Sequence, residues 1–154
     1  MASPNAPQAD PVEVDRVWFR FMRLHQRLLG QITLRIRTLG LSIPQFDLLS
    51  TLTEREGISQ SELAERLYVT KGNVSGLVDR LVQAGLVERR AIAGDRRSYA
   101  MHLTPEGRRL AEAGMAAQRE FVANTLGRLP AQDIAALDRL VQDWRDMSRA
   151  MDAE

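Results

Sequence analysis

The sequence has no cysteine and only two histidines, and both scarcities restrict its chemistry. Without cysteine the chain can form neither a disulfide framework nor a thiol switch. His25 and His102 are the only histidines, and His25 has no suitable ligand three or four residues along its helix, so no metal site is expected. The sequence also lacks a glycine-rich phosphate loop, a Ser/His/Asp arrangement and a paired-carboxylate cluster. These absences predict a protein that is not an enzyme and uses no cofactor.

Long apolar runs are lacking as well. No segment is long enough to span a bilayer and the N-terminus carries no apolar signal region, so we expect a cytoplasmic protein without a membrane partner. The 154 residues suffice for one domain with a real core. With 44% hydrophobic, 27% charged and only 5% aromatic residues, the composition is typical of a helix-rich protein in solution.

The formal net charge of +1 conceals an uneven distribution of charge. Arginines concentrate in the first predicted helix and again between residues 71 and 109, whereas acidic residues are in excess after Leu110. A basic middle and an acidic end would orient the protein on a polyanion such as nucleic acid.

The first part of the chain has the spacing of helices. Residues 1–11 are rich in proline and alanine and are expected to form a disordered tail. A wide apolar stripe predicts a long helix at Val12–Thr38. Two capping boxes then predict two further helices. They are Ser42 with Gln45 before Phe46–Glu54, and Ser59 with Glu62 before Gln60–Leu67.

A short helix and a hairpin follow. Thr70 is a capping residue before a helix at Lys71–Ala84, and Gly85 is free to take the left-handed conformation that ends it. Two runs with strand character, Leu86–Ile92 and Ser98–Leu103, are separated by a basic loop, Ala93–Arg97. Together with the preceding helix, these elements predict a winged helix-turn-helix. The fold class is therefore mainly α with a small β-hairpin wing.

Three short motifs resemble those of the MarR family of transcription regulators. They are Gly85-Leu86-Val87-Glu88-Arg89, then Asp95-x-Arg97 in the hairpin, then Leu103-Thr104-Pro105-Glu106-Gly107. The resemblance covers roughly residues 12–150. It implies a homodimer that binds a double-stranded DNA operator.

The helices at both ends of the chain are too apolar for one winged-helix module. Pro105–Leu126 and the helix that starts at Pro130 carry apolar stripes, as does the first helix, and exposed apolar surface of this size favours a dimer interface. The predicted organisation has four parts. They are a tail at 1–11, an N-terminal dimerisation helix at 12–40, a winged helix-turn-helix DNA-binding lobe at 41–103, and C-terminal dimerisation helices at 104–154.

The predicted DNA-binding residues lie on the second helix of the pair and on the wing. In the family, the arginine at the position of Arg97 enters the minor groove, and the aspartate at the position of Asp95 braces it. Donors at the start of the helix suit base edges and phosphates. Arg89 and Arg90 point to opposite faces of a strand, so one is expected to meet phosphate and the other to form a structural ion pair. The full set is Thr70, Lys71, Asn73, Ser75, Arg89, Arg96 and Arg97.

An organic effector is expected because the residues that would sense oxidants or metal ions are lacking. In the family the ligand lies between the interface helices and the winged-helix lobe. Aromatic side chains beside arginines suit an amphipathic anion, such as an aromatic carboxylate or its thioester. Constitutive DNA binding is the alternative. The predicted pocket residues are Trp18, Phe21, His25, Arg20 and Phe46.

The predicted function is a homodimeric, sequence-specific repressor that the effector releases from a pseudo-palindromic operator. Two alternatives belong to other classes. An architectural DNA binder of low specificity is compatible with the few side chains that the helix offers to bases. A winged-helix module for protein contacts predicts a neutral or acidic wing, which Arg96 and Arg97 contradict.

Overall fold

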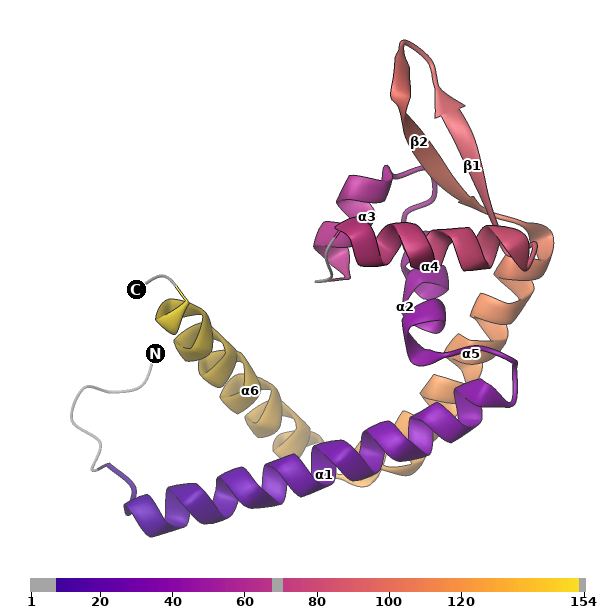
Figure 1. Ribbon diagram of the computed structural model, residues 1–154. Helices are drawn as coiled ribbons and strands as arrows, with labels where there is room; N and C mark the ends of the chain where they lie inside the picture. Colours follow the sequence, from indigo (N-terminus) through magenta and orange to yellow (C-terminus); the bar gives the residue numbers. More distant parts are fainter. Residues whose placement is uncertain (1–7, 68–70, 153–154) are drawn as a thin grey trace. The chain divides into compact units, whose positions relative to one another are not determined.

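The computed structural model describes residues 8–67 and 71–152, which form six α-helices, one short 3₁₀ helix and one antiparallel hairpin (Figure 1). This confirms the predicted fold class. Within the described ranges, no helix is both long enough and apolar enough to cross a membrane. The elements in chain order are α1 (Pro11–Arg37), α2 (Ile43–Glu54), α3 (Gln60–Arg66), α4 (Lys71–Gln83), β1 (Val87–Ile92), β2 (Asp95–Leu103), α5 (Pro105–Asn124), η1 (Leu126–Arg128) and α6 (Ala131–Met151).

The chain divides into two compact units. Residues 29–119 form one, here called the winged-helix unit, and residues 1–28 with 120–154 form the other, here called the terminal unit. The winged-helix unit thus contains the end of α1 and most of α5, as well as the lobe expected at 41–103.

The core of the winged-helix unit is made by apolar residues at helical spacing. Val74, Val78 and Leu81 recur every three or four residues along α4 and are fully buried, as the apolar stripe of an amphipathic helix should be. Their neighbours in the same core come from α2, α3, β2 and the end of α1. The largest of them are Leu48, Leu49, Leu52, Leu63, Met101 and Ile36.

Both predicted capping boxes are present. Ser42 Oγ accepts a hydrogen bond from the Gln45 backbone N–H at 3.3 Å, and the Gln45 side chain accepts one from the Ser42 N–H at 2.9 Å. Ser59 and Glu62 make the same reciprocal pair before α3. The predicted start of α2 at Phe46 was three residues late, because the proline that follows Ile43 fits the first turn of a helix.

The first helix also begins earlier than predicted, at Pro11. Asp10 is its cap: the carboxylate accepts from the Val12 N–H at 2.9 Å, and the backbone carbonyl accepts from the N–H groups of Glu13 and Val14. An aspartate cap followed by proline in the first turn is a strong helix start. The end of the expected tail is therefore part of the helix boundary, and the tail before residue 8 lies outside the described residues.

The wing is tighter than predicted. The expected loop Ala93–Arg97 is wrong, because β2 already begins at Asp95 and the turn is Ala93-Gly94, with Gly94 at φ +84°. Ile92 pairs with Asp95 but Ala91 pairs with Tyr99, so the register shifts between Ala91 and Ile92. This irregularity, as in a β-bulge, accommodates the extra residues of β2 and re-aims their side chains. They are Arg96, Arg97 and Ser98.

The base of the wing is tied to the loop before α3. The Met101 N–H donates to the Ile58 carbonyl at 2.9 Å, and the Gly57 N–H donates to the Met101 carbonyl at 2.8 Å. Ser59 and Ala100 complete this short antiparallel pairing. It holds the start of α3 against β2, a contact that the sequence patterns did not indicate.

Two of the sequence motifs, Gly85–Arg89 and Leu103–Gly107, contact each other where α5 begins, in what is here called the joint. Thr104 Oγ1 donates to the Gly85 carbonyl at 2.6 Å and accepts from the Gly107 N–H at 3.0 Å. A Cβ atom on Gly107 would lie 1.9 Å from the Leu86 carbonyl oxygen, so only glycine fits. Gly85 takes φ +72°, the left-handed conformation expected at the end of α4. The end of α4, the wing and the start of α5 are therefore held as one piece.

The terminal unit is rich in exposed apolar side chains. Its aromatic residues pack together: the ring centroids of Phe21 and Trp144 are 4.9 Å apart, and those of Trp18 and Trp144 are 6.0 Å apart. Large apolar residues of α6 remain on the surface, with Leu140 exposed to 59% and Met147 to 62%.

Candidate nucleic-acid interface

The second helix of the pair, α4, presents polar residues away from the core. Asn73 is exposed and Ser75 is half-buried, while Val74 between them is fully buried. Thr70 and the Lys71 side chain lie outside the described residues, so their predicted contacts stay predictions. Gly72 and Gly76 leave open space on this helix, since a Cβ atom at either would meet nothing within 4 Å.

Beside α4 lies the wing, whose tip carries Arg96 and Arg97, both exposed. Asp95 Oδ1 accepts a hydrogen bond from the Arg97 backbone N–H at 2.9 Å. This hydrogen bond is the main cause of a lowered pKa of the Asp95 carboxyl, and a bond from the Ser98 hydroxyl adds to it. Asp95 therefore fixes the backbone that bears the Arg97 side chain.

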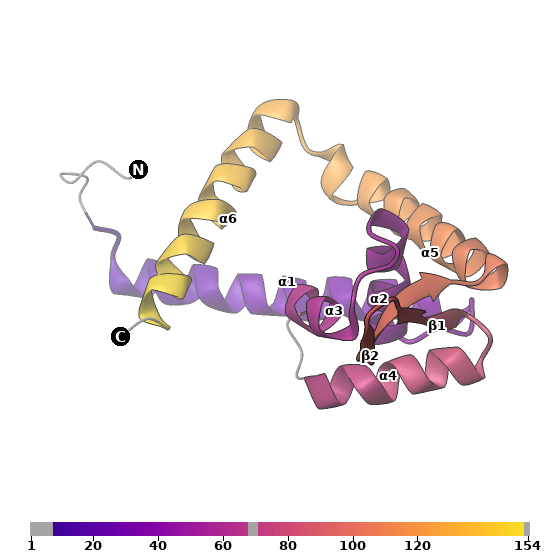
Figure 2. The same cartoon turned by 90° about the horizontal axis from the view of Figure 1, so that it is seen from above.

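A polar hollow of about 370 Å³ lies between α3, α4 and the wing. In Figures 1 and 2 these elements lie side by side in both views. Two arginines line the hollow, Arg89 from β1 and Arg97 from β2, together with Ser75 from α4. None of its described lining residues is acidic. The other lining residues are Ser59, Gln60, Ser61, Ser98 and Tyr99, so hydroxyl and amide groups accompany the two guanidinium groups.

Arg89 and Arg90 differ in their partners. The Arg89 Nη2 atom lies 2.5 Å from Asp79 Oδ1 of α4, and the Arg89 side chain is 27% exposed. The Arg90 Nη2 atom lies 3.2 Å from Glu88 Oε2 of the same strand, and the Arg90 side chain is 57% exposed. Both arginines are thus in ion pairs, and of the two only Arg89 lines the hollow. Asp79 was not predicted, because its pairing depends on the packing of the wing against α4.

A second acidic residue, Glu56, was also missed. Its Oε1 atom accepts from the Leu103 N–H at 2.9 Å and lies 3.7 Å from His102 Nδ1, and its Oε2 atom accepts from Arg108 at 2.6 Å. Glu56 therefore links the end of α2 to the base of the wing and to α5. Among the described residues no group of three or more His, Cys, Asp or Glu side chains is arranged to hold a metal ion.

The predicted effector residues fall in both units. Trp18, Phe21, Arg20 and His25 belong to the terminal unit, where the rings of Phe21 and His25 stack at 6.4 Å and Trp144 joins the cluster. Phe46 is a core residue of the winged-helix unit and is 3% exposed; a Cβ atom on Gly114 would lie 2.6 Å from its ring.

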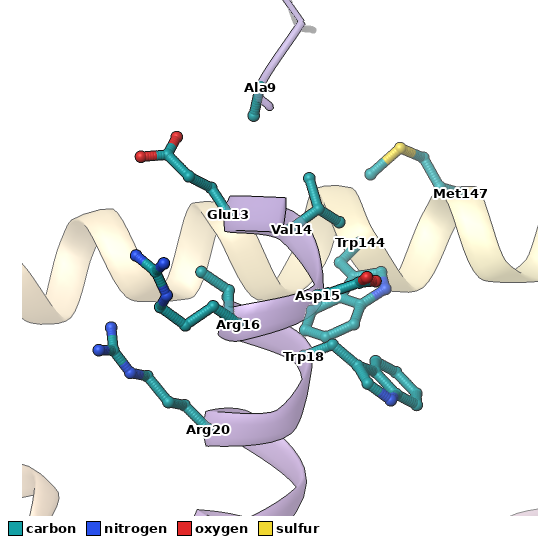
Figure 3. Close-up of a pocket in the computed structure, with 10 residues that line it drawn as sticks. Ala9, Glu13, Val14, Asp15, Arg16, Trp18, Arg20, Trp144 and Met147 are labelled. Carbon is teal, nitrogen blue, oxygen red and sulfur yellow. The ribbon is translucent and has the colours of Figure 1, made fainter. Parts of the chain in front are cut away.

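The terminal unit has a broad hollow of about 940 Å³ along α1 and α6. Trp18, Arg20, Trp144 and Met147 are among its lining residues. Figure 3 shows that the Arg20 side chain extends to one side of α1 and the Trp18 ring to the other. Trp18 and Arg20 are two positions apart, and an α-helix turns by about 200° over two residues, so the two side chains leave opposite sides of α1. Trp144 was not among the predicted pocket residues, and its approach to Trp18 joins parts of the chain that are distant in sequence.

These elements define a winged helix-turn-helix protein, and comparison with known proteins gives its family. A sequence model described as MarR family matches residues 39–98. The HTH-type transcriptional repressor Rv2887 of Mycobacterium tuberculosis is 32% identical over 112 residues, which are 73% of this chain and 81% of that protein. The chain belongs to the MarR family of transcription regulators. This membership confirms the prediction of a regulator rather than an enzyme.

Solved structures agree on the fold. AbsC, a MarR family transcriptional regulator from Streptomyces coelicolor, has a TM-score of 0.82 at 22% identity, covering 94% of this chain and 99% of AbsC. FabT of Streptococcus pneumoniae, solved in complex with DNA, has a TM-score of 0.80 at 18% identity, covering 90% of this chain and 99% of FabT.

Proposed function

We propose that this protein is a homodimeric transcription regulator that binds a double-stranded DNA operator through the winged-helix unit and is released from it by a small organic ligand. The observation that carries the proposal is the polar hollow, where α3, α4 and both wing strands bring together Arg97, the ion-paired Arg89 and several hydroxyl groups. Guanidinium and hydroxyl donors on adjacent elements suit the phosphates and base edges of a duplex.

The roles of individual residues follow from their places. Arg97, at the exposed wing tip, would enter the minor groove, where the negative potential is strongest in narrow A·T-rich segments. Asn73 and Ser75 on α4 would face the major groove, together with Lys71 and Thr70. Arg96 would meet an adjacent phosphate. The FabT complex with DNA supports the use of this fold on a duplex.

The dimer is supported by the apolar surface of the terminal unit. Large apolar side chains that remain exposed on a single chain are a liability unless a partner covers them. A second copy of the chain is the natural partner, since a two-fold axis places two α4 helices on successive major grooves. The exposed residues include Val12, Val14, Val17, Phe19, Leu24, Leu137, Leu140, Val141, Met147 and Met151.

Repression and ligand release are supported by the relatives and by the aromatic cluster. Rv2887 is named a transcriptional repressor. The cluster of Trp18, Phe21 and Trp144 offers apolar walls, and Arg16 and Arg20 lie on the same hollow. An aromatic carboxylate or its thioester suits such a site. To act as a switch, it must bind the DNA-free dimer more tightly than the DNA-bound dimer.

The test of DNA recognition compares two labelled duplexes by fluorescence anisotropy at physiological salt. One carries the DNA upstream of the protein's own gene, and the other a shuffled sequence of equal composition. A specific regulator should prefer the first by about a thousandfold or more. Affinities within about tenfold of each other would instead support the architectural alternative, which the two glycines on the outer face of α4 favour.

The test of ligand release uses a gel-shift titration and the fluorescence of the two tryptophans, which both belong to the cluster. Aromatic acids and their thioesters should release the DNA and change the tryptophan emission. Peroxide and metal chelators should do neither. Release by peroxide or a chelator would contradict the proposal, and release without a change in emission would move the ligand away from this cluster.

A further inference from the structure

The ion pair between Asp79 and Arg89 joins the two elements expected to contact DNA. Asp79 lies on α4, one helical turn after Ser75, and its side chain is 56% exposed. Arg89 lies on β1 and lines the polar hollow beside Arg97. The 2.5 Å contact between them is therefore at the edge of the hollow.

We propose that Asp79 limits the affinity of this protein for DNA by neutralising Arg89, and so raises its discrimination between operator and other sequences. The inference rests on the proposed function. It makes Asp79 a positioning residue that acts through Arg89 and contacts no DNA itself.

The argument begins with charge. A carboxylate in direct contact with a guanidinium cancels most of its field at the distance of a third group, so an approaching phosphate meets Arg97 as a cation but Arg89 and Asp79 as a nearly neutral pair. The Arg89 side chain is only 27% exposed and its Nη2 atom lies 2.5 Å from Asp79 Oδ1, so water screens this charge less than it screens a fully exposed arginine. Arg89 then releases no counterion when DNA binds.

The second step concerns specificity. Contacts with phosphate add affinity for every sequence equally, and they supply essentially all of non-specific binding. An unpaired Arg89 would therefore tighten binding to all DNA, and the protein would dissociate more slowly from the competing sequences of a genome. Because Asp79 neutralises Arg89, a larger share of the binding free energy comes from base contacts.

The test is Asp79→Asn, in which the amide retains an oxygen that can accept from Arg89, so the wing can keep its place on α4. Affinity for the upstream duplex and for the shuffled duplex is measured between about 50 and 200 mM salt. Each freed arginine should steepen the slope of log K against log salt by about 0.9, so a dimer with both protomers on DNA changes by about 1.8. Over this range the affinity of the variant should fall about twelvefold more than that of the wild type.

Three further variants distinguish the release of Arg89 from a general effect of net charge. Asp79→Asn/Arg89→Gln should return to about the wild-type slope, because the freed cation is gone. Glu65→Gln removes one negative charge from α3 in the same unit, at an exposed position with no arginine partner among the described contacts, and should change the slope less. Asp79→Ser should change the slope in the same direction as Asp79→Asn, which guards against a folding defect peculiar to one variant.

The outcomes are distinct. Tighter binding to both duplexes, a steeper slope and a smaller ratio between the two affinities support the inference. Weaker or unchanged binding by Asp79→Asn would mean that Asp79 only braces Arg89, and a steeper slope that persists in the double variant would mean that Arg89 is not the cation released. A wild-type protein that binds neither duplex would contradict the proposed function itself.

Discussion

At the tip of the wing, one carboxylate fixes the backbone that carries the proposed groove-reading arginine. Asp95 accepts the Arg97 backbone N–H at 2.9 Å, while the Arg97 side chain remains exposed. An aspartate that bonds to the backbone two residues further on is a common way to set a turn. The sequence motif Asp95-x-Arg97 therefore has a mechanical reason: the first residue sets the direction in which the third one points.

Removal of the Arg97 side chain should weaken operator binding while the protein stays folded. Arg97→Ala is expected to lose about 1–3 kcal/mol of binding free energy at physiological salt, because it removes a contact inside a groove. Arg119→Ala removes an equal charge from an exposed position on α5 and serves as the control. Equal losses in the two variants, measured by anisotropy, would reduce Arg97 to one surface charge among many.

The Asp95 turn should depend on pH in a definite direction. Hydrogen bonds from the Arg97 N–H and from the Ser98 hydroxyl lower the pKa of the Asp95 carboxyl below its ordinary value of 3.8. A lowered pKa in the folded protein stabilises the turn above the ordinary value, and this contribution is lost as the pH falls through the lower, folded value. A carboxyl-carbon NMR titration should find Asp95 titrating below 3.8, together with loss of protection at the Arg97 amide; a midpoint at or above 3.8 would remove the basis of this turn.

At the scale of elements, the joint between Thr104 and Gly85 brings together two separate sequence motifs, Gly85–Arg89 and Leu103–Gly107. Thr104 bonds to the Gly85 carbonyl and to the Gly107 N–H, and α5 approaches the Leu86 backbone so closely that no Cβ fits at Gly107. Each motif is one half of the same contact. A displacement of α5 would therefore carry α4 and the wing with it.

This joint predicts opposite effects for two glycine substitutions. Gly107→Ala should lower the free energy of unfolding by about 2–3 kcal/mol, because the new methyl group overlaps the Leu86 carbonyl oxygen. Gly76→Ala, on the open side of α4, should raise it by about 1 kcal/mol, since alanine loses less conformational entropy in a helix. Urea unfolding measures both, and a Gly107→Ala variant as stable as the wild type would contradict the close packing.

Element boundaries were predictable from the sequence where local interactions set them. Ser59 and Gly85 act on residues within four positions of themselves, so α3 begins and α4 ends within one residue of the predicted places. The capping box of Ser42 was also found, although the start of its helix was predicted three residues late. The wing turn was predicted too long, because strand register depends on the partner strand and a bulge inserts residues without a sequence signal.

The candidate site was predictable only in part, for a related reason. Arg97 was found from a motif and Ser75 from its place near the start of a predicted helix, both of which are local. The pairing of Asp79 with Arg89 and the contact of Trp144 with Trp18 join residues that are distant in sequence. Periodicity and spacing carry no information on such contacts, so the hollow and the aromatic cluster became visible only with the fold.

At the scale of the whole molecule, the apolar surface of the terminal unit should govern assembly. Leu140→Asp places a carboxylate at a position that is 59% exposed on one chain and buried in the proposed dimer. Burial of an unpaired charge costs several kcal/mol, so the variant should be monomeric where the wild type is dimeric. Gln132→Asp adds the same charge to an exposed polar position of α6 and should remain dimeric.

Sedimentation velocity measures the oligomeric state of both variants. A C-terminal truncation tests the same surface independently. Deletion of Pro130–Glu154 should yield aggregate or monomer with little affinity for DNA. A dimeric Leu140→Asp protein, or a truncated protein that still protects a complete palindrome, would place the interface elsewhere.

The central claim is that two winged-helix units read one operator together, and footprinting of the full chain on the DNA upstream of its own gene tests it most directly. The account predicts two protected half-sites related by a pseudo-two-fold axis, with centres about 10 base pairs apart. It also predicts two protein chains for each protected duplex. Protection that is no stronger than on shuffled DNA, or one protected half-site bound by a single chain, would contradict it.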